Sequence, residues 1–358
     1  MEEVLVVGQG LSGTWLTWWL HQAGISCKLI DQSSSDSASM RAAGLINPVT
    51  GRRLVTTWMI DELMPFARNS YQEIGKFLGY SFIREITLID FFPGVQMLQS
   101  FQKRIEEDPA YLFAGRDSEK YSEWLRYDLG WGAIDPCGLV NVEELLSRWR
   151  IWLKENGMLT EAFFDISNLH VDDKGIRYAD IQHRYIIFCD GKSSSHNPYF
   201  SKLPFALNKG EGLLVEIKDL PAGQVYKKGM SLVPYRENIF WLGSSYEWAF
   251  VDNNPSENFR LQAENWLKNF LKLPFSVIEH FAAIRPATLE RRPFIGFHPL
   301  HPQIGILNGM GTKGCSLAPY FANQLVNTLK GEGKINPSAD IKRFEKILTR
   351  CNSDEIDR

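Results

Sequence analysis

The feature that most constrains this chain is a glycine pattern near its N-terminus. Four consecutive apolar residues, 4–7, run into Gly8-Gln-Gly10-Leu-Ser-Gly13, and an apolar stretch with helical spacing follows to about residue 23. A short, continuous, β-branched run is typical of a buried parallel strand. A second short strand is predicted over residues 26–30, directly before Asp31. This order of strand, glycine turn, helix, strand and acid predicts the βαβ start of a doubly wound α/β domain.

Each glycine of the pattern has a physical role in binding a dinucleotide. Gly8 permits the tight turn, Gly10 lets the backbone approach a pyrophosphate, and Gly13 lets the helix pack closely on the strand. The helix N-terminus faces the phosphates, and Asp31 is placed to accept hydrogen bonds from a ribose. A carboxylate here would repel the additional phosphate of NADP, which leaves NAD and FAD. The predicted contacts are Gly8, Gly10, Leu11, Ser12, Gly13 and Asp31.

A second glycine cluster lies about 300 residues further along the chain. Residues 304–307 form another short apolar run, followed by Asn308-Gly-Met-Gly-Thr-Lys-Gly314 and a helix predicted to begin near Ser316. Pro319 is compatible with the first turn of that helix. Glycines at three positions ahead of a helix again indicate that a ligand approaches the backbone. An NAD-binding dehydrogenase with a Rossmann domain, the first alternative, leaves this second cluster unexplained.

Several stretches now occur in an order that resembles a known family. They are GQGLSG with Asp31, RAAGLINPVTGRR (41–53), YIIFCDGKSS (185–194), LNKGEGLLVEI (207–217), AAIRPATLERRPFIGFHP (282–299) and NGMGTKGCSLAP (308–319). The chain resembles the D-amino acid oxidase, glycine oxidase and sarcosine oxidase family of FAD enzymes. It is also similar to the flavin domain of the bifunctional enzyme that matures methylaminomethyl-uridine in tRNA. The resemblance covers most of the chain and is weakest between about residues 55 and 130.

The resemblance implies FAD as the cofactor and assigns parts of it to parts of the chain. The first glycine loop and Asp31 would hold the ADP half. The second loop would lie beside the flavin pyrimidine, where its backbone N–H groups, the following helix and the Lys313 ammonium would stabilise the negative charge of the reduced ring. The further cofactor contacts that the resemblance implies are Ser39, Arg41, Ala42, Ala43, Gly44, Gly309, Gly311, Thr312, Lys313 and Gly314.

On the substrate side, the most informative residue is Arg285. It lies among apolar residues and precedes a proline, which is the setting of a partly buried arginine that needs an anionic partner. That partner is either an internal acid or a substrate carboxylate held by the guanidinium fork. The matching arginine of glycine oxidase-like proteins binds substrate carboxylate, so we expect Arg285 and Lys313 to be the catalytic groups. Residues 230–250 predict two strands around a turn, and Tyr235, Tyr246 and Trp248 are candidate substrate-lining aromatic residues.

Other chemistries find little support in the sequence. No GxSxG, HExxH or cluster of carboxylates at ligand spacing is present, so neither a hydrolytic triad nor a metal is predicted. The net charge of -3 argues against binding to nucleic acid or an anionic membrane. Five scattered cysteines without a CxxC fit a reducing compartment, and no apolar run is long enough to span a membrane. We therefore expect a cytoplasmic protein with no transmembrane segment.

The predicted architecture is a Rossmann-like α/β FAD-binding domain with a discontinuous substrate domain on a mixed or antiparallel sheet. The FAD domain is expected over residues 1–55, 130–200 and 280–345, the substrate domain over 56–129 and 201–279, and a tail over 346–358. Residues 95–128 are expected to form a helical cap or lid. The predicted activity is FAD-dependent oxidation of the C–N bond of an amino acid or N-substituted amino acid by hydride transfer, with O2 or another electron acceptor. A tRNA-modifying flavoenzyme is the second alternative.

Overall fold

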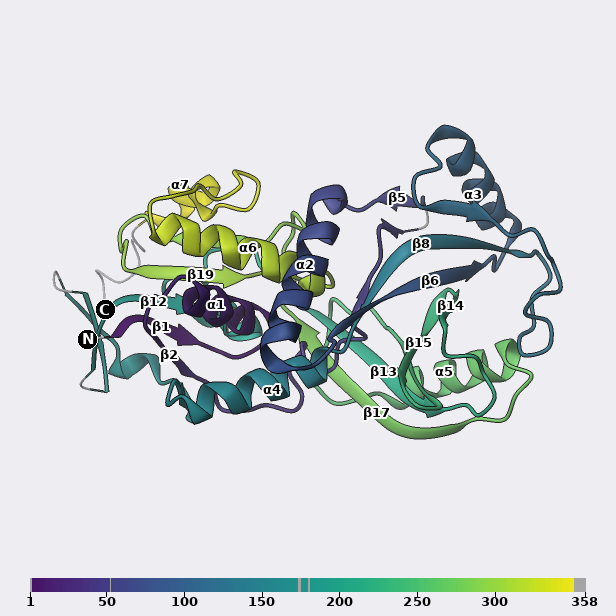
Figure 1. The fold of residues 1–358 in the computed structure, drawn as a ribbon, viewed down its shortest axis with the longest axis horizontal. Helices are drawn as coiled ribbons and strands as arrows, with labels where there is room; N and C mark the ends of the chain where they lie inside the picture. The colour runs from purple at the N-terminus through teal and green to yellow at the C-terminus, as the bar shows by residue number, and fades with distance from the viewer. Residues whose placement is uncertain (1, 52, 173–174, 180, 351–358) are drawn as a thin grey trace. The chain divides into compact units, whose positions relative to one another are not determined.

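The computed structural model describes residues 2–51, 53–172, 175–179 and 181–350, and these residues form two compact units. Unit 1 comprises Met1–Met40, Glu143–Asn208 and Ile284–Arg358, and unit 2 comprises Arg41–Val142 and Lys209–Ala283. The chain thus passes between the units at residues 40, 142, 208 and 283, whereas the sequence places these breaks near 55, 129, 200 and 279. Figure 1 shows both units as ribbons.

Unit 1 is built on a mainly parallel sheet. Strand β1 (Glu2–Val7) lies at its centre between β12 (Ile181–Phe188) and β2 (Cys27–Ile30), and all three run parallel. β19 (Ile304–Asn308) adds in parallel to β12, and β9 (Leu159–Thr160) adds in parallel to β2. The antiparallel additions are β18 (Phe294–Phe297), β10 (His170–Asp172) and β11 (Gly175–Tyr178). The predicted order of strand, turn, helix and strand is confirmed, and its apolar strands are buried.

Three helices accompany this sheet (Figure 1): α1 (Leu11–Gln22), α4 (Val142–Glu155) and α6 (Gly314–Leu329). α1 and α6 pack against each other, and the indole N–H of Trp19 donates to the Pro319 carbonyl at 2.9 Å. α4 reaches α1 through Trp149, whose indole N–H donates to Thr17 Oγ1 at 2.8 Å. Trp149 is fully buried and stacks on Trp152. These tryptophans therefore serve mainly as core between helices.

Four short helices complete the described part of unit 1. They are η1 (Ile166–Asn168), η2 (Gly191–His196), η3 (Ile341–Phe344) and α7 (Glu345–Leu348). Some of their residues join strand residues in an apolar core cluster. Leu348 is buried in the core cluster with Phe294 and Ile341, so the chain is packed up to this point. Of the tail expected over residues 346–358, residues 346–348 belong to α7, and residues 351–358 lie outside the described residues.

Unit 2 is organised around a larger mixed sheet of curved strands (Figure 1). The strand order is β17-β13-β16-β15-β14-β6-β8-β3, with β7 paired to β8. β14 and β6 are parallel, whereas β13, β16, β15 and β14 are antiparallel neighbours. The strands are β3 (Leu45–Ile46), β6 (Ile83–Phe91), β7 (Leu112–Ala114), β8 (Trp131–Val140), β13 (Asn208–Glu216), β14 (Gln224–Lys228), β15 (Met230–Arg236), β16 (Ile239–Gly243) and β17 (Ser276–Arg285).

Residues 95–128 differ in part from the expected cap. Helix α3 (Val95–Glu107) is present, but β7 then joins the sheet, and Tyr121 and Leu125 are buried in the core of unit 2. The lid expectation is therefore wrong for this second half, because its aromatic residues pack inward. The other elements of unit 2 are α2 (Ile60–Leu78), α5 (Glu257–Phe270), β4 (Val49–Thr50) and β5 (Val55–Thr56).

All the helices given above are formed by the described residues 2–51, 53–172, 175–179 and 181–350. None of the helices formed by them combines the length and the apolar character that crossing a bilayer requires.

Candidate functional site

The residues that the sequence singles out in unit 1 follow the ends of its parallel strands. Gly8 follows β1, Asp31 follows β2, Cys189 follows β12 and Gly309 follows β19. Because parallel strands end at one edge of a sheet, the four segments meet there. The carboxyl edge of an open α/β sheet is where such folds bind ligands.

The first glycine loop is packed so closely that side chains are excluded. Gly8 has a φ of +96°, and a Cβ atom on it would lie 2.7 Å from the Cys189 carbonyl oxygen. A Cβ atom on Gly13 would lie only 1.8 Å from the Gly8 carbonyl oxygen. On Gly10 it would lie 2.9 Å from Ser39 Oγ. The loop is thus a backbone surface that a ligand can approach closely.

The N-terminus of α1 presents backbone N–H groups at this loop. Gly10 occupies the N-cap position and has no side chain to cap the helix. The Leu11 N–H donates to Ser39 Oγ at 3.0 Å, which brings together two residues predicted to contact the cofactor. The N–H groups of Ser12 and Gly13 belong to the first helical turn, which has no intrahelical acceptors. A helix start of this kind favours a pyrophosphate.

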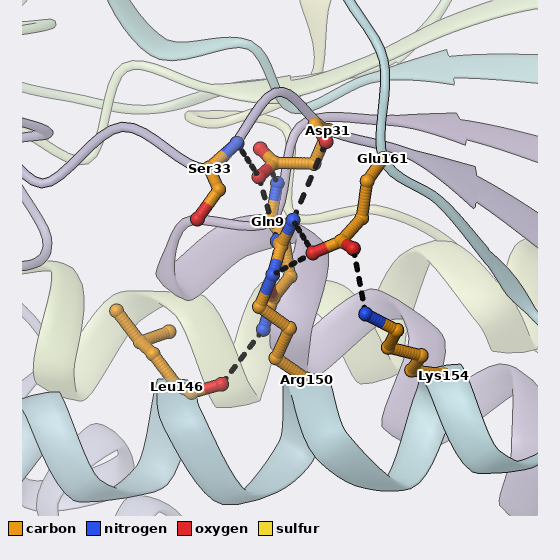
Figure 2. Close-up of polar contacts among 7 residues, drawn as sticks. All are labelled: Gln9, Asp31, Ser33, Leu146, Arg150, Lys154 and Glu161. Carbon is orange, nitrogen blue, oxygen red and sulfur yellow. Dashed lines mark hydrogen bonds and ion pairs between the residues drawn. The ribbon is translucent and has the colours of Figure 1, made fainter.

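Asp31 is held by three donors at the edge of this loop (Figure 2). Its carboxylate accepts from the backbone N–H groups of Gln9 and Ser33, each at 2.8 Å, and from Arg150 Nη1 at 2.8 Å. Arg150 comes from α4 and was not among the predicted site residues. Asp31 thus stands directly after β2, as the sequence predicts, and its carboxylate is bound by Arg150, which the sequence does not predict.

The second glycine loop has the backbone conformation that its glycines allow. Gly309 and Gly311 have φ angles of +77° and +55°. Asn308, 2% exposed, fixes the start of the loop because its amide donates to the Gly191 carbonyl and to Ser194 Oγ, each at 2.8 Å. The loop ends at α6, whose N-cap position is Lys313 without a side-chain cap.

The Lys313 ammonium lies near two other positively charged side chains, Arg291 and Arg292. Burial lowers its pKa, and the nearby charges of Arg292 and Arg291 lower it further. Thr312 beside it is exposed, whereas Lys313 is half-buried. A solvent-facing lysine in a loop would not be desolvated in this way. The arrangement gathers cations at the second loop, where it favours an anionic group.

The structure brings the two glycine loops together. A Cβ atom on Gly314, the first residue of α6, would lie 3.1 Å from Leu11 Cδ1 at the start of α1. Two helix N-termini therefore lie side by side at the edge of one sheet. The predicted contacts Gly8, Gly10, Leu11, Ser12, Gly13, Asp31, Ser39, Gly309, Gly311, Thr312, Lys313 and Gly314 all belong to unit 1.

Arg285 also belongs to unit 1 and lies next to the second loop. The Gly311 N–H donates to the carbonyl of Pro286 at 3.2 Å, so the residue after Arg285 is bonded to this loop. Arg285 is half-buried, and its Nη1 donates to Asn208 Oδ1 at 2.8 Å. Asn208 is 1% exposed and was missed by the sequence analysis. A neutral amide therefore orients this guanidinium.

The remaining predicted cofactor contacts belong to unit 2. Gly44 has a φ of +79°, and its carbonyl accepts from the Val140 N–H at 2.9 Å. Arg41 forms an ion pair with Glu279 at 2.7 Å and lies over the ring of Phe281. Ala42 and Ala43 lie between Arg41 and Gly44. Contact of these four residues with FAD stays a prediction.

The three aromatic substrate candidates are also in unit 2. Tyr235 is the second-last residue of β15 and packs partly against an apolar cluster, with Arg236 over its ring. Tyr246 and Trp248 follow β16 and are exposed, at 58% and 60%. The two strands predicted around a turn within residues 230–250 are confirmed as β15 and β16. The substrate-binding role of the three residues stays a prediction.

The residues of unit 1 fit FAD. The glycines leave no room for side chains, two uncapped helix N-termini offer N–H donors, an acid stands at the tip of β2, and cations stand at the second loop. A dinucleotide needs donors for its phosphates and an acceptor for its ribose. When bound, FAD supplies two-electron redox chemistry.

Comparisons with known proteins identify a family of FAD-dependent enzymes. The family model of DAO-type FAD dependent oxidoreductases matches residues 3–328. Glycine oxidase of Pseudomonas putida is 29% identical over 143 residues, which are 38% of this chain and 39% of that protein. The chain is thus matched over well under half of that relative's length.

Two solved structures share the fold over nearly the whole chain. Glycine oxidase from Geobacillus kaustophilus has a TM-score of 0.79 at 17% identity and covers 98% of both chains. Iminodiacetate oxidase from Chelativorans sp. BNC1 has a TM-score of 0.76 at 18% identity and covers 96% of this chain and 98% of its own. The predicted fold class is confirmed, and the family match confirms FAD over NAD. The chain belongs to the DAO family of FAD-dependent oxidoreductases.

Proposed function

We propose that this protein oxidises the C–N bond of a small amino acid or N-substituted amino acid. The observation that carries the proposal is the placement of Arg285. Arg285 is half-buried, and the carbonyl of the next residue, Pro286, accepts from the Gly311 N–H of the second glycine loop. Its guanidinium donates to the Asn208 amide oxygen, which orients it. A planar guanidinium is a rigid fork of N–H donors that matches the two oxygens of a carboxylate.

The roles of the residues follow from this placement. Arg285 binds the substrate carboxylate and so fixes the α-carbon and its amine. The backbone of residues 309–314 and the Lys313 ammonium supply positive potential where negative charge develops during reduction. Orientation and electrostatics suffice for a hydride transfer from a neutral amine, so no acid–base pair is required of the chain. Tyr235, Tyr246 and Trp248 are proposed to line the substrate.

The known oxidases of this fold support the substrate class. The similar proteins include one named glycine oxidase and one named iminodiacetate oxidase. Glycine and iminodiacetate share an amine next to a carboxymethyl group, which is the unit that Arg285 would recognise. The proposed acceptor of the electrons is O2 or another carrier. Scattered cysteines without a CxxC pattern support a cytoplasmic location, and the net charge of -3 supports a protein that does not bind nucleic acid.

The test is an anaerobic titration of the holoenzyme with matched compounds. Glycine, sarcosine, proline, D-alanine and iminodiacetate are compared with the corresponding amides while the visible flavin band is recorded. We expect at least one carboxylate to bleach the flavin and its amide to fail. Arg285→Met should abolish this preference, whereas Arg177→Met, which removes an exposed arginine of β11, should keep it. The proposal is contradicted if dithionite reduces the flavin but none of the compounds of the panel does.

A further inference from the structure

Arg150 lies outside both glycine patterns, yet its side chain makes five hydrogen bonds in the cofactor-binding region. It projects from α4 toward the first glycine loop and Asp31 (Figure 2). Its Nη1 donates to Gln9 Oε1 at 2.7 Å and to Asp31 Oδ1 at 2.8 Å. Its Nη2 donates to Glu161 at 3.0 Å and to the Asp31 carbonyl at 3.4 Å, and Nε donates to Glu161 at 3.3 Å.

These five contacts account for all the hydrogen-bond donors of Arg150. A guanidinium has five N–H groups and no acceptor. Arginines near the acid of a dinucleotide site can accommodate a 2′-phosphate. Arg150 has no N–H left for such a group, because all its donors are used by protein atoms of the site. We propose that Arg150 is a positioning residue that fixes Asp31 and the first glycine loop for the adenosine half of FAD.

The Asp31 carboxylate keeps only part of its acceptor capacity for the cofactor. A carboxylate offers about four acceptor positions. The N–H groups of Gln9 and Ser33 and the Arg150 guanidinium use three of them. One position remains, so Asp31 accepts one ribose hydroxyl rather than both. The orientation of that last lone pair depends on the three donors that hold the carboxylate.

Gln9 extends the same support to the glycine loop. Its side chain is buried, and its Nε2 donates to the Leu146 carbonyl of α4 at 2.9 Å while its Oε1 accepts from Arg150. α4 therefore holds the residue between Gly8 and Gly10 through two bonds. Removal of Arg150 would release this loop and leave the carboxylates of Asp31 and Glu161 without the cation they share.

The chain offers a matched control on the same helix. Lys154 is one turn beyond Arg150 and pairs with Glu161 at 2.9 Å (Figure 2). Its side chain is 66% exposed, compared with 17% for Arg150. Lys154→Met therefore removes a cation and a Glu161 contact but leaves Asp31 and Gln9 held. Exposed pairs of this kind contribute little.

The experiment compares FAD with FMN, which lacks the adenosine half. Apoprotein of wild type, Arg150→Met, Arg150→Lys and Lys154→Met is titrated with each flavin, and flavin fluorescence gives the Kd. We expect Arg150→Met to raise the Kd for FAD at least tenfold and the Kd for FMN less than twofold. Arg150→Lys keeps the charge without the fork and should raise the Kd for FAD by threefold or more. Lys154→Met should change neither value by more than twofold.

A double-mutant cycle shows whether Arg150 acts through Asp31. If it does, Asp31→Asn with Arg150→Met should weaken FAD binding little more than Asp31→Asn alone. Equal loss of FAD and FMN affinity, or an unchanged Kd for FAD in both Arg150 variants, would overturn the proposal. If Arg150→Met does not fold, Arg150→Lys decides by the same criteria. The readout is cofactor binding, so the outcome does not depend on which substrate the enzyme oxidises.

Discussion

Replacing Gly13 by alanine tests the packing of the first glycine loop most directly. In an open position of a helix, alanine is more stable than glycine by about 0.5–1 kcal/mol. Gly13 lies in the first turn of α1, so helix propensity alone predicts stabilisation. The structure predicts the opposite sign, because the new Cβ atom would lie 1.8 Å from the Gly8 carbonyl oxygen.

The size of the effect follows from this distance. Ordinary contact begins at 3.4 Å, so α1 and the loop would have to separate by about 1.6 Å. The obstructing atom belongs to the backbone and cannot rotate away. Forcing additional atoms into a packed region typically costs about 1–3 kcal/mol, which exceeds the gain in propensity. The displaced helix start would also move the N–H groups that face the phosphates, so FAD affinity should fall tenfold or more.

Gly314 provides the control, because it is the first residue of α6. There the new Cβ atom would lie 3.1 Å from Leu11 Cδ1, the tip of a flexible side chain. We expect Gly314→Ala to change the free energy of unfolding by less than about 1 kcal/mol, within the range of well-tolerated core changes. Urea unfolding of the apoproteins and FAD titration measure both variants. A Gly13→Ala protein that is at least as stable as wild type and binds FAD equally well would refute the reasoning.

Three other predictions concern charge. Arg285→Met should raise the KM for a carboxylate substrate about 10- to 100-fold, the equivalent of a charge-assisted hydrogen bond, with the flavin spectrum unchanged; steady-state kinetics check this. Lys313→Met should lower the two-electron flavin potential by about 20–40 mV, corresponding to about 1–2 kcal/mol, in an equilibrium dye titration, and an unchanged potential would contradict a role at the flavin. Burial raises the pKa of Asp190 to about 6, so the folded protein holds the proton of this carboxyl more tightly than the unfolded chain does. The resulting stabilisation is fully present below about pH 4 and is lost as the pH rises through about 6. Asp190→Asn should remove this part of the pH dependence, at most about 3 kcal/mol, in denaturation series at pH 4 to 7.

The sequence predicted the parts of the site that depend on local structure. A strand, a glycine turn and a helix N-terminus are each encoded within a few residues, so Gly8, Gly13 and Gly309 could be placed from spacing. Asp31 could be placed because it follows the second strand directly. These features coincide in space because parallel strands end at one edge of the sheet, a consequence of the fold class itself.

The residues that were missed depend on contacts between distant segments. Arg150 and Asp31 are 119 positions apart, and Arg285 and Asn208 are 77 positions apart. Spacing carries no information about such pairs. A signal for Arg150 existed, since it stands between Trp149 and Ile151 in an otherwise apolar helix segment. This is the same reasoning that identified Arg285, and it indicates a partly buried cation that needs partners.

The two glycine loops of unit 1 differ in charge, and the difference matches the two ends of one cofactor. At the first loop the acids Asp31 and Glu161 are matched by the cations Arg150 and Lys154, so the corner offers an acceptor with little net charge. A ribose is neutral and needs such an acceptor. At the second loop Lys313, Arg292 and Arg291 are close enough to lower the pKa of the lysine. A reduced flavin is anionic and is stabilised by such a surplus of positive charge. Exchanging the two environments would weaken the binding of both the ribose and the reduced flavin. The division of charge between the loops therefore supports a single bound FAD that reaches from one loop to the other.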